Sequence, residues 1–239
     1  MPDTAPEVDV PGEFVSFKYP LPHLAKALRG NAPIRIVAMG SSSTAGRWDV
    51  VPYPHRLEMY LRAHYETEQY PNLRIDVLNR GMGGQEAVEE LPRFEDDILA
   101  ERPSLVIWQV GTNAVFHKEK YDLGDVAAKI ADGLERLRGK QMDVVLIDPQ
   151  YTPAMLLDDR AEMAERMVSL ISAAAGKAKV NLFRRWALMR HWHVHNNVAF
   201  DRMFDPTDLP DRLHQSDWST LGVSKALCDA ITRAPPVPA

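Results

Sequence analysis

The chain contains one cysteine, Cys228, among its 239 residues, so no disulfide can form within it. Cys228 falls in the apolar phase of the last helical pattern, and we expect a buried thiol there. The chain also lacks the run of about 18 apolar residues that a transmembrane helix requires, so no transmembrane segment is predicted. With a formal net charge of -5 and no Lys/Arg stripe, it has no surface suited to a phosphate backbone, and no nucleic-acid partner is expected.

The two ends of the sequence carry little information about structure or compartment. The first residues, MPDTAPEVDVPGEF, are proline-rich and acidic, whereas a secretory signal is basic and then apolar. They fit a cytoplasmic chain as well as an exported chain whose signal has been removed, so the sequence assigns no compartment and no oligomeric state. We predict an N-terminal extension over residues 1–30, a single folded domain over 31–233 and a C-terminal tail over 234–239.

Short apolar runs alternate with amphipathic helical patterns along that domain. Each run is apolar in both phases, which is typical of parallel strands covered on two faces. The alternation predicts a three-layer α/β/α sandwich with a five-stranded parallel sheet. The expected strands cover residues 34–39, 74–79, 105–110, 143–148 and 179–183.

Three of these strands are followed by segments that carry hydroxyls, bare backbone or a carboxamide. They are GSSST at 40–44, GMGG at 81–84 and GTN at 111–113. Ligands of an open parallel sheet bind outside the carboxyl ends of its strands, so these segments are expected at one rim. The GMGG segment is a poor phosphate or dinucleotide loop, because it lacks the full glycine fingerprint and a Gly-Lys-Ser/Thr sequence.

A serine at such a rim becomes a nucleophile only when a base removes its proton and an acceptor orients that base. Asp211 and His214, three residues apart before the last helix, could supply both functions or could form a plain surface turn. An oxyanion also needs donors, which the Gly84 N–H and the Asn113 amide could provide. Alternatively, the glycines only allow the chain to turn and Asn113 caps a helix.

Taken together and in this order, the four segments resemble the blocks of the SGNH/GDSL hydrolase family. Ser42 matches the nucleophile of the Gly-Asp-Ser-x-Thr block, and Gly84 matches the oxyanion glycine of the second block. Asn113 matches the Gly-x-Asn block, while Asp211 and His214 match Asp-x-x-His. The resemblance spans most of the chain. The sequence departs from the family pattern at two positions. Ser41 stands where the family usually has aspartate, and Gly83 stands where serine is frequent.

The resemblance implies a flavodoxin-like SGNH hydrolase fold and a carboxylic ester hydrolase with a Ser42-His214-Asp211 triad. The oxyanion would be held by the backbone N–H groups of Ser42 and Gly84 and by the Asn113 side chain. It implies a small-molecule or saccharide ester substrate with short acyl groups, and no cofactor or metal. The same triad could serve an O-acyltransferase or a thioesterase, and a catalytically silent carbohydrate-binding homologue is a further alternative.

Two other features have mainly structural interpretations. The HWHVH segment at 191–195 has a spacing that can bind zinc when extended, but no further ligand is evident. We expect a polar connection there, with Trp192 and Val194 packed inward. Trp108 is expected in the core, whereas Trp48 fits either a pocket rim or plain packing.

Overall fold

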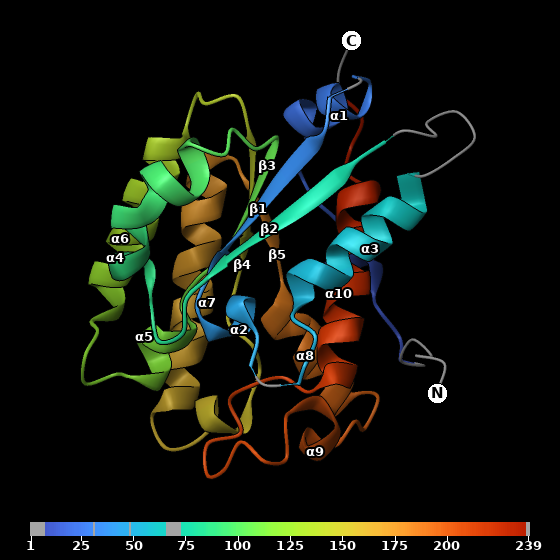
Figure 1. Ribbon diagram of the computed structural model, residues 1–239. Helices are drawn as coiled ribbons and strands as arrows, with labels where there is room; N and C mark the ends of the chain where they lie inside the picture. The colour runs from blue at the N-terminus through green and yellow to red at the C-terminus, as the bar shows by residue number, and fades with distance from the viewer. Residues whose placement is uncertain (1–7, 31, 48, 66–72, 238–239) are drawn as a thin grey trace.

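The computed structural model describes residues 8–30, 32–47, 49–65 and 73–237, and its centre is a parallel sheet with strand order β2-β1-β3-β4-β5. Figure 1 shows this sheet between two layers of helices. The prediction of a three-layer α/β/α sandwich with a five-stranded, flavodoxin-like sheet is confirmed. The strands are β1 (Ile34–Gly40), β2 (Ile75–Gly81), β3 (Leu105–Gln109), β4 (Asp143–Ile147) and β5 (Asn181–Phe183).

Alternate residues of the strands enter two separate hydrophobic cores. In β1, Ile36 and Ala38 pack into one core, whereas Val37 and Met39 pack into the other. All four side chains are fully buried. This double burial explains why the strands are apolar in both phases, and it makes the sheet a rigid support for its loops.

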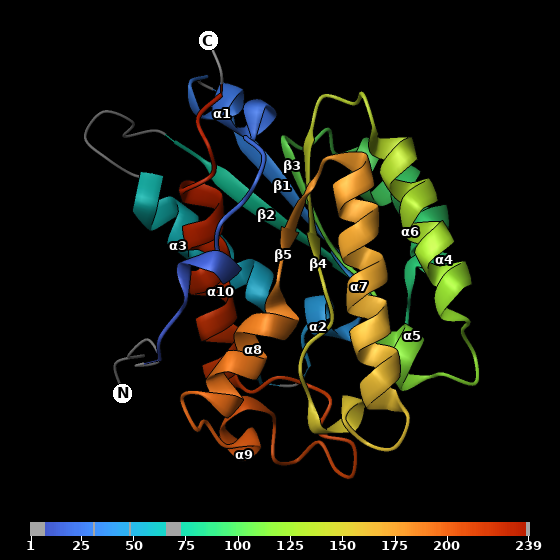
Figure 2. The same ribbon diagram turned by 180° about the vertical axis from the view of Figure 1, so that it is seen from behind.

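Four helices and the segment before β1 cover the first face of the sheet (Figure 2). Cys228 is buried on α10, which packs against α3, and burial raises the pKa of its thiol to about 12. The helices are α1 (Pro22–Leu28), α3 (Tyr53–Tyr65), α8 (Arg185–Val194) and α10 (Asp217–Thr232).

The HWHVH segment, which was expected to be a polar connection, forms the C-terminal end of α8, with His195 as the C-cap residue. Trp192 is buried as expected, but Val194 is half exposed because the helical turn carries it to the outer side. The rings of His191 and His195 stack on one another, one helical turn apart. Among the residues with described positions, no group of three or more His, Cys, Asp or Glu side chains is arranged to hold a metal ion.

The second face is covered mainly by α6 and α7, with α4 and α5 beside them. The Asp122 side chain caps α6 by accepting hydrogen bonds from two backbone N–H groups. Pro92 interrupts the helix after β2, because α4 gives way there to a 3-10 turn and then to a π-helical turn. The bounds are α4 (Ala87–Glu90), α5 (Thr112–Phe116), α6 (Leu123–Leu137) and α7 (Arg160–Ala178).

Two short helices, α2 (Ser42–Ala45) and α9 (Phe200–Met203), lie near the carboxyl ends of the strands, while α1 lies at the opposite end (Figure 1). The 3-10 turns are Gly12–Phe14, Leu91–Arg93 and Pro153–Met155, and the π-helical turn is Glu95–Leu99. In the part of the chain that the structure describes, no helix has the length and apolar character needed to cross a membrane.

Candidate active site

Ser42 is the first residue of α2, and Ser41 alone separates it from the end of β1. The backbone must make a close turn here, since a Cβ on Gly40 would lie 2.4 Å from Thr44 Oγ1. A Cβ on Gly81 would lie 2.1 Å from the backbone nitrogen of Ala45, so α2 rests directly on the end of β2. The two glycines thus allow the strand ends to hold the Ser42 hydroxyl in one place.

Gln109, at the end of β3, provides the internal hydrogen bonds of the Ser42 loop. Its Oε1 accepts from the Ser41 N–H at 3.2 Å, from the Ser41 hydroxyl at 3.0 Å and from the Thr44 hydroxyl at 3.4 Å. Gln109 is 1% exposed, so these bonds are shielded from water. Ser41 stands where the GDSL pattern has aspartate, and Gln109 provides its hydrogen-bonding partner.

The structure brings His214 to Ser42 from 172 residues further along the chain. The His214 Nε2 lies 3.0 Å from the Ser42 Oγ, within the hydrogen-bonding distance that a base and a nucleophile require. The His214 side chain is 16% exposed, so the pair is sheltered and yet reachable from solvent. The structure thus brings together two of the predicted site residues, Ser42 and His214, from distant segments of the chain.

The carboxylate on the other side of the imidazole belongs to Asp208, whereas Asp211 was expected there. Asp208 Oδ2 lies 2.8 Å from His214 Nδ1, and it also accepts from the backbone N–H of His214 at 2.8 Å and of Leu213 at 2.9 Å. Asp211 is exposed to solvent. Its pairing with His214, predicted from the Asp-x-x-His spacing, is therefore not what the structure shows.

The reason lies in the turn that leads to His214. The backbone N–H of Arg212 donates to the Asp208 carbonyl oxygen at 2.6 Å, and Arg212 itself has a positive φ of 47°. This folds the chain back, so that the backbone N–H groups of Leu213 and His214 face Asp208 while Asp211 lies on the outside of the turn. Sequence spacing alone contains no sign of this reversal.

Asp208 is well suited to remain an anion. Burial alone raises the pKa of its carboxyl, but the hydrogen bonds from the His214 backbone and ring outweigh burial, so that the pKa is lowered. The Arg47 guanidinium forms an ion pair with Asp208 Oδ1, and its Nη1 lies 2.7 Å from His214 Nδ1. Because an ionised carboxylate only accepts, the bond to Asp208 requires the imidazole proton on Nδ1 and leaves Nε2 to accept from Ser42.

Gln150, which follows β4, joins the Ser42 loop to the His214 loop. Its Oε1 accepts from the Ser43 hydroxyl at 3.1 Å and from the Gln215 amide at 3.2 Å, while its Nε2 donates to the Leu213 carbonyl oxygen. Gln150 is 1% exposed. Its side chain therefore ties the segment after Ser42 to the residues on both sides of His214.

The loops after β2 and β3 bring Gly84 and Asn113 toward the same edge. The N–H of Met82 donates to the Gly40 carbonyl oxygen at 2.9 Å, and a Cβ on Gly83 would lie 3.9 Å from the Ser42 Cβ. Gly84 has a φ of +76°, and a Cβ there would meet open space. Asn113 is 3% exposed, and its amide donates to the Gln85 carbonyl oxygen at 2.7 Å.

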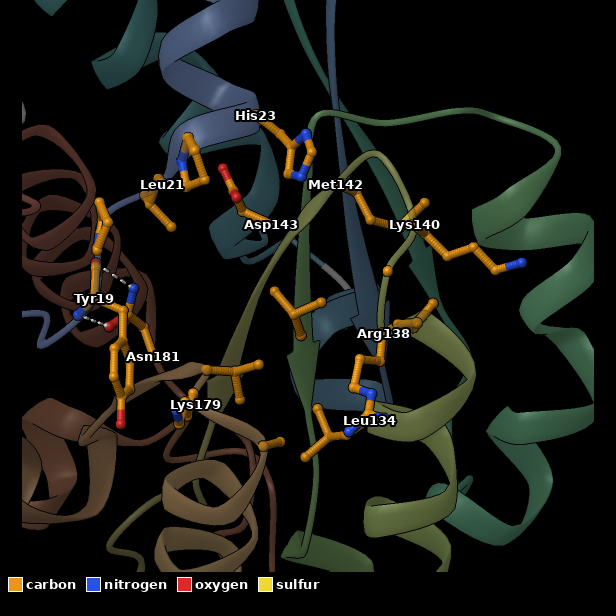
Figure 3. Close-up of a pocket in the computed structure, with 17 residues that line it drawn as sticks. Tyr19, Leu21, His23, Leu134, Arg138, Lys140, Met142, Asp143, Lys179 and Asn181 are labelled. Atoms are coloured by element: carbon orange, nitrogen blue, oxygen red, sulfur yellow. Dashed lines mark hydrogen bonds between the residues drawn. The ribbon is translucent and has the colours of Figure 1, made fainter. Parts of the chain in front are cut away.

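Two hollows of very different size lie at opposite ends of the sheet. The cavity beside Ser42 measures about 20 Å³ and is bordered by Ser43, Arg47, Pro52 and His214. A larger groove of about 370 Å³, drawn in Figure 3, lies where β4 and β5 begin. The groove in Figure 3 is therefore remote from Ser42, whereas the small cavity beside Ser42 shares Val50 with a hollow of about 520 Å³.

The sequence reasoning found Ser42 and His214, but it missed the polar residues that hold them. Of these, Gln109 carried a detectable signal, because it is a polar residue at the end of an otherwise apolar strand. Gln150, three residues beyond the end of β4, carried the same kind of signal. Asp208 and Arg47 carried none, because both lie in irregular segments. Trp108 is fully buried as expected, and Trp48 lies outside the described residues.

With this geometry established, comparison with known proteins identifies the family. Residues 7–234 match the Non-GDSL lipase-like family. The chain belongs to that family. The match supports a lipase-like hydrolase, and the more specific resemblance to SGNH/GDSL enzymes stays a prediction. A stretch of 79 residues is 35% identical to the uncharacterized lipoprotein YqeF of Bacillus subtilis (strain 168), covering 33% of this chain and 31% of that protein. The match thus spans about a third of that curated relative.

Solved structures share the fold at low sequence identity. The acetylxylan esterase Axe2 of Geobacillus stearothermophilus, seen as a catalytic serine mutant, superposes with a TM-score of 0.69 at 19% identity. That match covers 84% of this chain and 96% of Axe2. LAE5, an alpha/beta hydrolase from the metagenome of Lake Arreo, Spain, has a TM-score of 0.69 at 15% identity over 86% of this chain and 99% of its own. Catalytic mutants of Axe2 at an aspartate and at a histidine have also been solved.

Proposed function

We propose that this chain is a carboxylic ester hydrolase of the SGNH type that works through an acyl-enzyme on Ser42. The observation that carries the proposal is the Ser42-His214-Asp208 chain of hydrogen bonds, at 3.0 Å and 2.8 Å. A serine, a histidine and a carboxylate linked in this order are the parts of a nucleophilic triad. Membership of a lipase-like family and the shared fold with an acetylxylan esterase support an ester as the substrate.

In the first half-reaction, the Ser42 Oγ attacks the acyl carbon while His214 Nε2 takes the hydroxyl proton. Asp208 stabilises the resulting imidazolium through Nδ1. The C–O bond to the alcohol then breaks, and His214 returns the proton to the leaving oxygen. In the second half-reaction, a water molecule attacks the acyl-serine, with His214 again acting first as base and then as acid.

The negative oxygen of both tetrahedral intermediates would be held by three donors. They are the backbone N–H groups of Ser42 and Gly84 and the side-chain amide of Asn113. The Asn113 amide has two hydrogens, and one of them points to the Gln85 carbonyl oxygen. That bond fixes the orientation of the amide and leaves the second hydrogen for the substrate.

The preferred acyl group is small. The cavity in contact with Ser42 measures about 20 Å³, which favours a short acyl group there, and it shares Val50 with a hollow of about 520 Å³ that could receive the alcohol part of the substrate. An acetylated saccharide is the substrate class that Axe2 suggests by its name. Acyl transfer to an added alcohol and thioester hydrolysis would use the same triad, and both are compared in the test below.

The test measures hydrolysis of nitrophenyl acetate, butyrate and octanoate beside acetylated xylo-oligosaccharides and an acetyl thioester, with and without an added alcohol acceptor. We expect the acetyl esters to be hydrolysed fastest. The variant Ser42→Ala should fall to the background rate and lose labelling by a fluorophosphonate probe, while the control Ser169→Ala, at an exposed serine of α7, keeps both. Full activity in Ser42→Ala would refute the proposed nucleophile, and absence of labelling in the wild type would indicate a catalytically silent binding protein.

A further inference from the structure

Glu86 is a buried acid that the mechanism above does not use. It is 2% exposed, and its carboxylate accepts three backbone hydrogen bonds. Its Oε1 accepts from the N–H of Ala87 at 3.0 Å and of Gly111 at 2.8 Å, and its Oε2 accepts from the N–H of Ala114 at 3.0 Å. Three donors and no acceptor facing one carboxyl suit its ionised form.

These bonds do more than cap a helix. Glu86 is the N-cap residue of α4, and the bond to Ala87 serves that purpose. The bonds to Gly111 and Ala114 instead reach the loop after β3, 25 and 28 residues further along the chain. Capping the four-residue α4 requires neither of these two bonds. We therefore expect them to act on the loop after β3, by holding its backbone in place.

The two segments that Glu86 joins are those that carry the oxyanion donors. Gly84 lies two residues before Glu86, and Asn113 lies between the two residues whose N–H groups Glu86 binds. The Asn113 amide donates to the carbonyl oxygen of Gln85, the residue directly before Glu86. Two sets of contacts therefore set the position of the Gly84 N–H relative to the Asn113 amide. They are the bonds to the Glu86 carboxylate and the bond from Asn113 to the Gln85 carbonyl oxygen.

Glu86 lies beside a second buried acid, Glu90, and the pKa of each of the two carboxyls is raised. Burial raises the pKa of Glu86, and its backbone donors oppose that effect. Burial and the Glu86 carboxylate together hold the pKa of Glu90 well above its ordinary value. Glu90 accepts from Trp108 Nε1 at 2.6 Å and touches neither oxyanion segment through a described bond. Glu90 is therefore a matched control for removing a buried acid.

We propose that Glu86 is a positioning residue for the oxyanion site, which fixes the Gly84 N–H and the Asn113 amide in register by clamping the loops after β2 and β3. This role rests on the proposed function, because it presumes that these two groups bind the oxyanion. An oxyanion donor acts chiefly in the transition state, so a displaced donor lowers kcat while KM stays nearly constant.

The decisive experiment is a double-mutant cycle on nitrophenyl acetate hydrolysis. Glu86→Gln alone should lower kcat about tenfold to a hundredfold, less than outright loss of one oxyanion donor, with KM unchanged within about twofold. In an Asn113→Ala background, the same change should lower kcat by no more than about threefold, because the group being positioned is already absent. Equal factors in both backgrounds would show that Glu86 does not act through Asn113 and would overturn the proposal.

Two controls separate positioning from plain stability. Asp122→Ala removes a cap whose side chain binds two backbone N–H groups of α6, so it should lower the melting temperature and leave kcat unchanged. Glu90→Gln should behave in the same way. A fall in kcat in both controls as large as that in Glu86→Gln would contradict the positioning role.

A second variant covers the case in which Glu86→Gln does not fold. Glu86→Asp keeps the charge and a good N-cap residue but is one methylene too short to hold Gly111 and Ala114. It should fold, and it should lower kcat and slow fluorophosphonate labelling of Ser42 by similar factors. Labelling at the wild-type rate would overturn the proposal. If wild-type activity does not depend on Ser42, the proposed function itself fails. If Ser42 is required but Glu86→Asp is labelled at the wild-type rate, only the positioning role of Glu86 fails.

Discussion

Ser42 is flanked by two groups of residues that are held in different ways. On the side of the proposed oxyanion site, Gly84 and Asn113 follow strands β2 and β3, and buried backbone N–H groups of the β3 loop donate to the Glu86 carboxylate, which joins the two loops. On the other side, His214 lies in a loop outside the sheet, and side-chain contacts from Asp208 and Gln150 hold that loop. The comparison teaches that strand ends and one buried carboxylate hold the proposed oxyanion half of this site, whereas side-chain contacts around a loop outside the sheet hold the proposed acid–base half.

The prediction with the largest effect concerns the acid–base half. Asp208→Asn should lower kcat about 10³–10⁴-fold, because the amide favours the wrong tautomer of His214 and no longer stabilises its imidazolium. Asp211→Asn is the matched control and should stay within about twofold of wild type, since Asp211 is exposed on the outside of the turn. Steady-state kinetics on nitrophenyl acetate measure both variants.

The reverse order of effects would show that the loop rearranges when substrate binds and brings Asp211 to His214. In that event the Asp-x-x-His spacing would describe the catalytic state, and the contact with Asp208 would belong only to the free protein. A crystal structure of the fluorophosphonate adduct would then have Asp211 at His214 Nδ1.

An intermediate effect is expected on the oxyanion side. Asn113→Ala should lower kcat about 10²–10³-fold, the usual cost of losing one oxyanion donor. KM should change little, because the donor acts in the transition state, and the melting temperature should fall only slightly. A KM increase with unchanged kcat would instead assign Asn113 to ground-state binding and would weaken the contrast between the two halves.

The smallest effect is expected for the residue that links the His214 loop to the Ser42 loop. Gln150→Ala removes bonds to Ser43 and Gln215 and leaves the buried Leu213 carbonyl oxygen without this donor. We expect a loss of about 1–3 kcal/mol in the free energy of unfolding and a fall in kcat of up to about tenfold, as for one neutral hydrogen bond. Denaturant unfolding and steady-state kinetics measure the two effects. A loss as large as that of Asp208→Asn would mean that Gln150 dominates the placement of His214.

Much of the oxyanion half could be predicted because its residues follow regular elements. The apolar runs located the five strands, and parallel strands place their carboxyl ends at one edge, so the loops containing Ser42, Gly84 and Asn113 had to lie near one another. The bonds from Gln109 and Glu86 that position these loops could not be predicted in detail. They depend on side-chain reach across strands, which no local pattern encodes.

The acid–base half could be predicted only in part. His214 was found because it precedes the last helix, but its acid was misassigned because the turn at Arg212 reverses the chain. A spacing of three residues suits an acid and base on one face of a regular turn. The structure uses a spacing of six and encloses Asp208 within the loop. The same dependence on local conformation explains the HWHVH segment, which proved to be helical.

The lone thiol on α10 has a practical use that is independent of catalysis. Cys228 is buried against α3, and its pKa of about 12 leaves almost none of the reactive thiolate at neutral pH. Alkylating reagents can then reach it only when the helix pair separates. The rate of its modification reports opening of that face of the sheet, and a serine-directed probe can report separately on the catalytic edge of the same molecule.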